Sequence, residues 1–463
     1  MPADDTIETL SSNAWCGVAA SGALAPSSLQ WGARRDLPRP SQSLAPKEVD
    51  LDDWTHPKVG WGVVLADRDD VPAADKAVGA DAPEPIRVLL AARGNAPVLR
   101  WRPDLKEGRL RRYAVDGSWS DPSLRGARGL ADNAVPRYLL IVGSPAQVPW
   151  SAQYRLQTEA FIGRLDLDQG GLERYVEALL AVWSCAPRDV RRPLLWCVDH
   201  GHPDITRLMR RTISEKLRDA FASDAEFDIG DGFLSDGQAT HAQLLASLGE
   251  RQPAFIATSS HGATFPLDNP AAMRAQMGAL VDASHTVGSS DAVAAAWNPR
   301  GAIWYAHACC SAGADAKSRF EGLVQADSTL GRTLAAIAGA GACTAPLPRV
   351  LLGGANPLAA FIGHVEPTFD WTLRDPLTGQ VTSQHIVDAL YGTLHLAKRP
   401  TLGRAMSAYF SGVAGLLQDN ADALDAIEAQ EPDALSRARR SRMVATDRLA
   451  MVILGDPTVR LPL

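Results

Sequence analysis

The chain has 463 residues, of which 46% are hydrophobic and 21% charged, a composition typical of a folded globular protein with room for two or three domains. Its net charge of -7 argues against nucleic acid as the main partner, because phosphate binding needs concentrated Lys and Arg. No apolar window of about 20 residues predicts a transmembrane helix, and the acidic N-terminus lacks the pattern of a signal peptide. Six cysteines without a CxxC pair suit a reducing compartment, so we expect a cytoplasmic protein that binds neither nucleic acid nor membrane.

The first part of the chain shows little regular patterning. Residues 1–50 are rich in Ser, Ala, Pro and Gly, which predicts a partly ordered leader. A small β-containing region is expected over 51–130, with strands over 61–66 and 86–92. The pattern then changes, so we place the start of the main region at residue 131.

Strands and helices alternate in the rest of the chain. Residues 131–375 are predicted to form the catalytic α/β region, with strands at 138–143, 193–198, 253–260, 301–308 and 358–363. Residues 376–463 are predicted to add C-terminal helices and a final strand. This order predicts a mainly parallel sheet with helices on both faces.

Two of the apolar runs end at residues with catalytic potential. One ends at His261-Gly262 and the other at Cys309-Cys310, and about 50 residues separate the His from the Cys, a spacing also found in caspases. Catalytic groups in open α/β sheets gather at the carboxyl ends of strands. Each motif alone fits a buried cysteine or a turn histidine equally well. Together they favour a cysteine peptidase with a Cys-His pair.

The neighbours of the pair suggest further roles. Cys309 and Cys310 are both candidates for the nucleophile. Gly262 leaves room for a substrate backbone, and its amide is placed to donate to an oxyanion together with the amide of the nucleophile. His307 precedes Cys309 by two residues and lies on the same strand face, where it either contacts substrate or is an ordinary buried histidine.

Five segments in chain order resemble the gingipain-like cysteine peptidases, relatives of the caspases, legumains and separases in clan CD. The resemblance covers roughly residues 136–463 and rests on Tyr138-Leu-Leu-Ile-Val-Gly-Ser-Pro-Ala-Gln-Val-Pro149, Phe161-Ile-Gly-Arg164, His261-Gly262, Ala308-Cys309 and Leu454-Gly-Asp-Pro457. It implies a caspase-like fold and a thiol protease that makes limited, regulatory cuts in protein substrates. It also implies that Cys309 is the nucleophile, with Cys310 as its rival, and that His261 is the general base or acid. Bacterial relatives of this kind work in immunity or cell death, and an activating partner protein is compatible with that role.

The resemblance also implies roles for acidic residues. Asp199 is expected to orient the imidazole of His261, with a turn cap as the alternative. Asp204 is expected at the base of a pocket that selects Arg or Lys, with a helix N-cap as the alternative. Some relatives bind calcium, but Asp166 and Asp168 lack EF-hand spacing and favour a solvated turn, so no cofactor is expected.

Two other functions stay open. The chain is also compatible with a catalytically silent caspase-like scaffold that binds a protein, and with a Cys-His acyl transferase or amidase that is not a peptidase. Arg34-Arg35 in the leader offers a basic-specific enzyme a place to cut itself, which is a hypothesis of latency.

Overall fold

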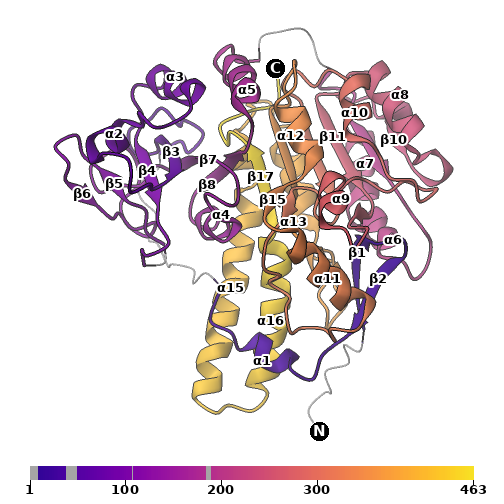
Figure 1. Cartoon of the computed structure of the whole chain (residues 1–463). Coiled ribbons are helices and arrows are strands. Elements are labelled where there is room, and N and C mark those ends of the chain that lie inside the picture. Colours follow the sequence, from indigo (N-terminus) through magenta and orange to yellow (C-terminus); the bar gives the residue numbers. More distant parts are fainter. Residues whose placement is uncertain (1–8, 38–48, 107, 184–188, 463) are drawn as a thin grey trace.

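A computed structural model describes residues 9–37, 49–106, 108–183 and 189–462, and its centre is a 10-stranded sheet (Figure 1). In spatial order the strands are β10 (Phe233–Leu234), β9 (Leu194–Cys197), β11 (Phe255–Ser259), β13 (Ile303–His307), β16 (Ala360–His364), β17 (Met451–Gly455), β8 (Phe161–Leu165), β7 (Tyr138–Val142), β3 (Trp61–Ala66) and β4 (Val98–Trp101). The two-stranded pairs β5 (Arg112–Tyr113) with β6 (Trp119–Ser120) and β14 (Gly313–Ala314) with β15 (Cys343–Thr344) lie outside it.

The sheet consists of two parallel halves that run in opposite directions. All neighbours from β10 to β16 pair in parallel, as do all neighbours from β17 to β4. Only β16 and β17 pair antiparallel, with Ile362 opposite Ile453. The predicted α/β fold with a mainly parallel sheet is therefore confirmed. The carboxyl ends of β11 and β13, where His261 and Cys309 follow, lie at the same edge.

Helices cover both faces of the sheet. Leu139 and Leu140, which point to opposite faces of β7, belong to two separate apolar clusters, one shared with α4 and the other with α3. The helices are α1 (Ser28–Gly32), α2 (Ala73–Val78), α3 (Glu84–Ala92), α4 (Trp150–Gln157), α5 (Gln169–Leu180), α6 (Ile205–Met209), α7 (Glu215–Ala222), α8 (His241–Arg251), α9 (Pro270–Ala275), α10 (Ser290–Ala296), α11 (Thr329–Ala340), α12 (Pro346–Leu352), α13 (Gln384–Val387), α14 (Leu402–Ala405), α15 (Ser407–Glu428) and α16 (Ala434–Leu449).

The predicted strand over 86–92 is wrong, because these residues belong to α3. Its buried apolar residues Ile86, Leu89 and Leu90 have the i, i+3, i+4 spacing of one helix face, and Pro85 stands in the first turn. β3 and β4, which precede and follow α3 in the sequence, both join the large sheet: β3 pairs with β7, and β4 pairs with β3. Residues of the 51–130 region thus extend the sheet of the main region.

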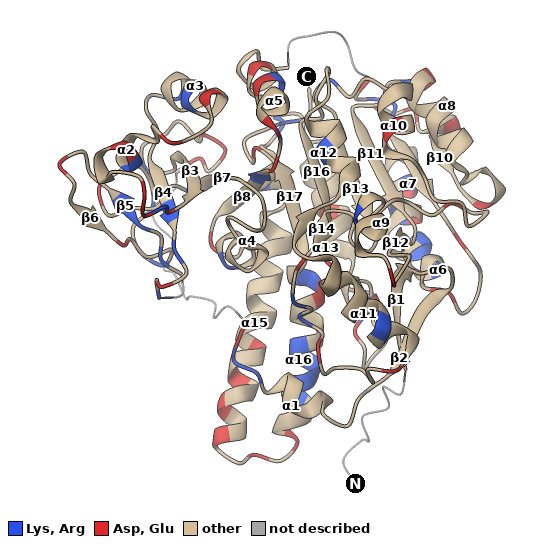
Figure 2. Cartoon of the chain, in the orientation of Figure 1, with Lys and Arg blue, Asp and Glu red and all other residues tan. Residues whose placement is uncertain are grey.

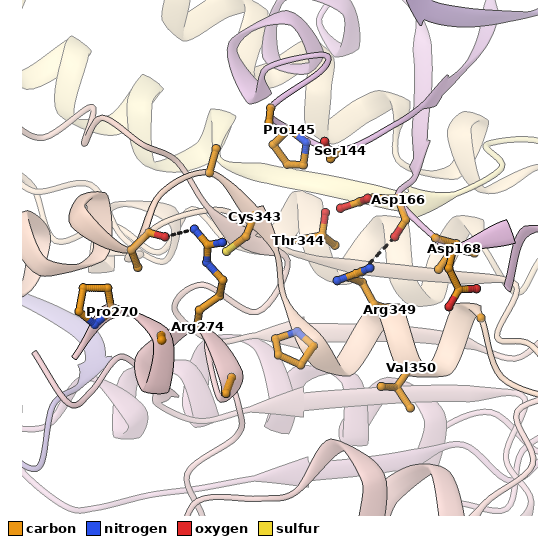
Figure 3. Close-up of a pocket in the computed structure, with 18 of the residues that line it drawn as sticks. Ser144, Pro145, Asp166, Asp168, Pro270, Arg274, Cys343, Thr344, Arg349 and Val350 are labelled. Atoms are coloured by element: carbon orange, nitrogen blue, oxygen red, sulfur yellow. Dashed lines mark hydrogen bonds between the residues drawn. The ribbon is translucent and has the colours of Figure 1, made fainter. Parts of the chain in front are cut away.

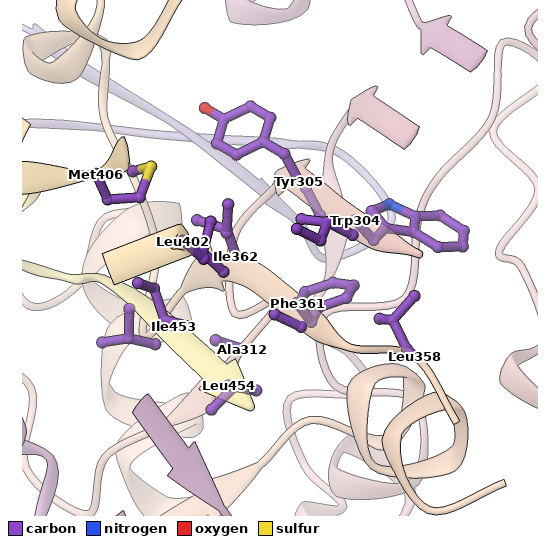
Figure 4. Close-up of a cluster of buried hydrophobic side chains, with 14 of the residues drawn as sticks. Trp304, Tyr305, Ala312, Leu358, Phe361, Ile362, Leu402, Met406, Ile453 and Leu454 are labelled. Carbon is purple, nitrogen blue, oxygen red and sulfur yellow. The ribbon is translucent and has the colours of Figure 1, made fainter. Parts of the chain in front are cut away.

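Large apolar side chains fill the place where the two halves of the sheet meet (Figure 4). Trp304 of β13 and Phe361 of β16 lie with ring centroids 6.2 Å apart, and Ile453 and Leu454 of β17 continue the cluster. This packing holds the carboxyl ends of β13 and β16 in fixed positions. The segments that follow them both contribute to the site described below.

A buried arginine supports the other half of the sheet. Arg164, in the Phe161-Ile-Gly-Arg164 segment, is fully buried and donates to Gln153 Oε1 (2.8 Å), Gly143 O (2.9 Å) and Val148 O (2.7 Å). Its guanidinium lies 4.5 Å from the ring centroid of Trp150. Because burial disfavours the charged guanidinium, it lowers the pKa of Arg164 to about 9.

We expect Arg164→Met to lower the free energy of unfolding by about 2–4 kcal/mol, because it leaves buried carbonyl oxygens without donors. Chemical denaturation measures this difference. Arg87→Met, at an exposed position of α3, is the matched control and is expected to stay within about 0.5 kcal/mol of the wild type. Equal values for the two variants would contradict the structural role of Arg164.

The N-terminal segment enters the molecule as a hairpin and then a helix. β1 (Thr9–Trp15) pairs with β2 (Ala19–Ala23) and, in parallel, with β12 (Gly262–Ala263), which makes a separate three-stranded sheet. α1 then packs against α16, which forms a hairpin with α15 (Figure 1). Acidic side chains gather on α15 and basic ones on α16 (Figure 2). In the described ranges, no helix has both the length and the apolar character needed to cross a membrane.

Candidate active site

The structure brings the two predicted strand ends into contact. β11 and β13 are parallel neighbours with Ser259 opposite His307, so His261 and Cys309 follow at the same edge. A Cβ atom on Gly262 would lie 1.9 Å from the carbonyl oxygen of Cys309, so only glycine permits this approach. His261 and Cys309 are both fully buried.

The imidazole of His261 is held from both sides. Its Nε2 lies 2.9 Å from Asp204 Oδ2 and its Nδ1 lies 2.8 Å from the carbonyl oxygen of Asn13. Both of these oxygens are acceptors, so the two hydrogen bonds form together only when both ring nitrogens carry a proton. The arrangement therefore leaves neither ring nitrogen free to accept a proton.

Asp204 serves as an N-cap and as the partner of His261. Its Oδ1 accepts from the amide (2.8 Å) and the hydroxyl (2.6 Å) of Thr206, which caps α6. Burial by itself would raise the pKa of Asp204, but the hydrogen bond and charge of His261, together with the Thr206 donors, hold it well below its ordinary value. Both carboxylate oxygens are thus engaged, one by the helix and the other by the imidazole.

Asp199 and His307 make their hydrogen bonds elsewhere. Asp199 Oδ1 accepts from the amide of Gly201 (2.8 Å) and Oδ2 lies 3.5 Å from a guanidinium nitrogen of Arg210, so this carboxylate supports the turn after β9. His307 is fully buried, its Nδ1 lies 2.8 Å from the hydroxyl of Tyr305, and its ring packs against His364. The carboxylate that contacts the imidazole of His261 is therefore Asp204.

The thiol of Cys309 is surrounded by hydrogen-bonding groups. The amide of Thr368 donates to its Sγ (3.1 Å), the hydroxyl of Ser12 lies 3.3 Å away, and the thiol donates to Asn13 Oδ1. Burial raises the pKa of the Cys309 thiol well above its ordinary value, and the bonds from Ser12 and Thr368 offset this only in part. In this state the group is a neutral thiol.

Cys310 occupies a different environment although it is adjacent. Its φ of 55° lies in the left-handed region, and its amide donates to the carbonyl oxygen of Glu366 (2.9 Å). A non-glycine residue in this region carries backbone strain, and such strain clusters at functional sites. Burial raises the pKa of Cys310 well above its usual range. Of the two thiols, the one on Cys309 contacts the same residue, Asn13, as His261 does.

Sequence reasoning missed the segment that covers the pair. Ser12 and Asn13 of β1 contact Cys309, and the ring of Trp15 lies 5.4 Å from that of His261. The ring of His200 stacks with that of Trp15, and the ring of His285 lies tilted against it at 4.7 Å. Small polar residues give β1 no hydrophobic alternation, so its sequence carries no strand signal of the usual kind.

The large hollow of about 1220 Å³ drawn in Figure 3 lies away from these residues. Its lining includes Asp166, Arg274, Cys343 and Arg349 but neither His261 nor Cys309. Both guanidiniums are already bound, that of Arg274 to the carbonyl oxygen of Ala340 and that of Arg349 to the carbonyl oxygen of Asp166 (3.2 Å).

Asp168, at the same hollow, is the N-cap of α5, where its Oδ1 accepts from the amide of Gly171 (2.7 Å). Across the described part of the chain, no three His, Cys, Asp or Glu side chains gather as a metal would require. The Asp166 and Asp168 pair is thus a capping turn beside a bound arginine.

The sequence matches no protein-family model and no curated protein. One solved structure that it resembles is described as "Structure of Protease". The two are 12% identical, the alignment covers 87% of this chain and 78% of that chain, and the TM-score is 0.46. The function of the chain must therefore be inferred from its own residues.

Proposed function

We propose that the chain is a cysteine endopeptidase in which Cys309 is the nucleophile and His261 the general base and acid. The observation that carries the proposal is that both groups contact the same residue of an extended segment, Asn13 of β1. The carbonyl oxygen of Asn13 meets Nδ1 of His261, and the side chain of the same residue meets the Cys309 thiol. A thiol and an imidazole that converge on an extended peptide have the arrangement that peptide-bond cleavage needs.

The chemistry follows the usual course for such a pair. Nδ1 of His261 takes the thiol proton, and Sγ of Cys309 attacks the carbonyl carbon of the peptide bond. The C–N bond breaks, the imidazolium gives its proton to the leaving amine, and an acyl-enzyme remains. Water then attacks the thioester while His261 accepts its proton, which releases the acid and restores the thiol.

Asp204 and Gly262 are proposed to support these steps. Asp204 holds Nε2 of His261, so Nδ1 is the nitrogen that faces the reacting groups. Gly262 lies against the backbone of Cys309, and we propose that the amides of these two residues stabilise the oxyanion.

The substrate is proposed to be a protein segment in extended form. A preference for Arg or Lys before the cut stays a prediction, and it needs a carboxylate other than Asp204, whose two oxygens are occupied. Limited regulatory proteolysis, a cytoplasmic location and an activating partner protein also stay predictions. The rival functions are a silent scaffold and a Cys-His acyl transferase or amidase.

The test combines turnover with covalent trapping. Wild-type protein is incubated for hours under reducing conditions with a peptide library varied at the residue before the cut. A parallel sample first receives a peptide acyloxymethyl ketone, which alkylates nucleophilic thiols. We expect slow hydrolysis, its loss after treatment with the ketone, and an adduct that peptide mapping by mass spectrometry locates on Cys309.

The alternatives predict other results. An adduct on Cys310 alone would assign the nucleophile to that residue. Hydrolysis that survives alkylation of all thiols would contradict a cysteine mechanism. Acyl transfer to hydroxylamine without peptide cleavage would favour the transferase or amidase.

A further inference from the structure

β1 lies in a slot between β12 and the segment Thr368–Phe369. On one side it pairs in parallel with β12, with Ala14 opposite Gly262, and Trp15 O accepts from the amide of Thr264 (2.9 Å). On the other side the amide of Asn13 donates to Thr368 O (3.2 Å), and Ser12 bridges antiparallel to Phe369. The segment is thus bound through its backbone, as a peptide ligand binds by adding a strand.

Two of the side chains that β1 buries are unusual for a purely structural strand. Ser12 and Asn13 are fully buried and polar, and the Asn13 amide nitrogen has only Met209 Sδ within reach, at 3.9 Å. A buried amide donor with so weak an acceptor is costly. The other partners of these two side chains are the Cys309 thiol, the carbonyl oxygen of Thr368 and the amide of Ala14, which donates to the Ser12 hydroxyl (3.2 Å). Their placement fits the reactive groups better than it fits a stable core.

This occupant also holds the reactive groups in an inactive state. Because the carbonyl oxygen of Asn13 accepts from Nδ1, His261 has no free nitrogen to take the thiol proton. The Asn13 side chain meanwhile covers Cys309. Peptide substrate and β1 cannot occupy the slot together.

The segment after β1 is fastened to the helical hairpin. Trp31 of α1 is buried and donates from Nε1 to Arg319 O (2.8 Å), and the guanidinium of Arg442 on α16 binds Arg34 O (2.8 Å) and Asp36. Arg35 pairs with Glu428 of α15 (2.5 Å). The Arg34-Arg35 pair is therefore engaged with α15 and α16, and β1 is a tethered occupant rather than a separate peptide.

We infer that β1 is an internal inhibitor of the peptide-binding slot: a substrate chain binds as an extended strand in its place, parallel to β12, only after β1 leaves. This inference rests on the proposed function and adds its regulation and the direction of the bound peptide. Asn13 blocks the site by contacting His261 and Cys309 at once.

The test uses the full-length chain with proline at position 13. Asn13→Pro removes the amide that donates to Thr368 O and the side chain that contacts Cys309. Because both losses weaken the binding of β1 in the slot, we expect the open fraction to rise about 10- to 100-fold. Thr9→Pro is the matched control, because proline is tolerated at the first residue of a strand. The first readout is the rate at which iodoacetamide alkylates Cys309, resolved by peptide mapping with Cys343 as the internal reference. The second readout is peptide hydrolysis.

A synthetic peptide with the sequence of residues 9–15 tests whether inhibition can be restored by adding β1 in trans. Added to the Asn13→Pro protein, it is expected to slow both alkylation of Cys309 and hydrolysis, while a scrambled peptide does not. Trp15→Ala, which removes the ring beside His261, is a second variant in case the proline variant does not fold.

The outcomes separate this inference from the proposed function. Faster alkylation of Cys309 without hydrolysis of any peptide would uphold inhibition by β1 and contradict the peptidase. Equal hydrolysis and equal alkylation in the wild type and in folded Asn13→Pro would uphold the peptidase and overturn the inhibition. If Thr9→Pro raised the rates of alkylation and hydrolysis as much as Asn13→Pro does, inhibition by β1 would also be overturned, because the increase would not depend on the contacts of Asn13 in the slot.

Discussion

Replacing Cys309 with alanine is expected to abolish peptide hydrolysis, with a loss of about four orders of magnitude or more in kcat. The reason is that the thiol supplies the electron pair that forms the acyl-enzyme, and none of its hydrogen-bond partners, Ser12, Asn13 and Thr368, can replace a thiolate. The rate is measured in the wild-type background and in the Asn13→Pro background.

Cys310→Ala is the matched control for this variant. It removes a neighbouring thiol of similar burial from the same apolar cluster, and alanine keeps the backbone at a φ of 55° no worse than cysteine does. We expect a modest loss of stability of about 1 kcal/mol and hydrolysis within about threefold of the parent. The reverse pattern would make Cys310 the nucleophile, and unchanged rates in both variants would contradict a thiol mechanism.

The strand ends of the site could be predicted because they depend on local patterns. Apolar runs that stop at small residues mark β11 and β13, and the alternation of strands and helices fixes a parallel arrangement for these neighbours. Residues 86–92 show the limit of such patterns. A short apolar run does not distinguish a buried strand from a helix face, and here α3 packs as a helix.

The partner of His261 depends on tertiary structure that local patterns do not contain. Asp199 and Asp204 both follow β9 and differ by five residues. The Asp199 carboxylate accepts a hydrogen bond from the amide of Gly201 in the turn after β9. Asp204 follows this turn, and its carboxylate contacts His261, which follows β11. The prediction gave Asp204 a pocket or a cap as alternatives, and the structure shows the cap together with a contact to the imidazole.

β1 was beyond sequence reasoning for a different reason. Its contacts with His261 and Cys309 join residues far apart in the chain, and its buried Ser12 and Asn13 resemble the residues of a solvated leader. Backbone hydrogen bonds place the segment, and these are independent of side-chain type. The Ser- and Ala-rich composition therefore predicts a partly ordered segment, whereas in the structure residues 9–15 are held between β12 and the segment Thr368–Phe369.

The second large effect is expected at Asp204. Asn and Ser cap helices about as well as Asp does, so Asp204→Asn and Asp204→Ser both preserve the cap of α6 while removing the carboxylate from Nε2 of His261. We expect kcat/KM for peptide hydrolysis to fall by about 10²- to 10⁴-fold in both variants. Asp199→Asn, which removes the neighbouring turn carboxylate, is expected to stay within about threefold of the parent.

A pH profile separates positioning from capping. The free energy of unfolding, measured as a function of pH, provides this separation. Because the pKa of Asp204 is lower in the folded chain than its ordinary value of about 3.9, its carboxylate stabilises the fold above that value. That contribution is lost as pH falls, so the difference in unfolding free energy between wild type and Asp204→Asn shrinks on acidification. Full activity in both Asp204→Asn and Asp204→Ser would show that Asp204 is only a helix cap. His261 would then act as the base without a carboxylate partner.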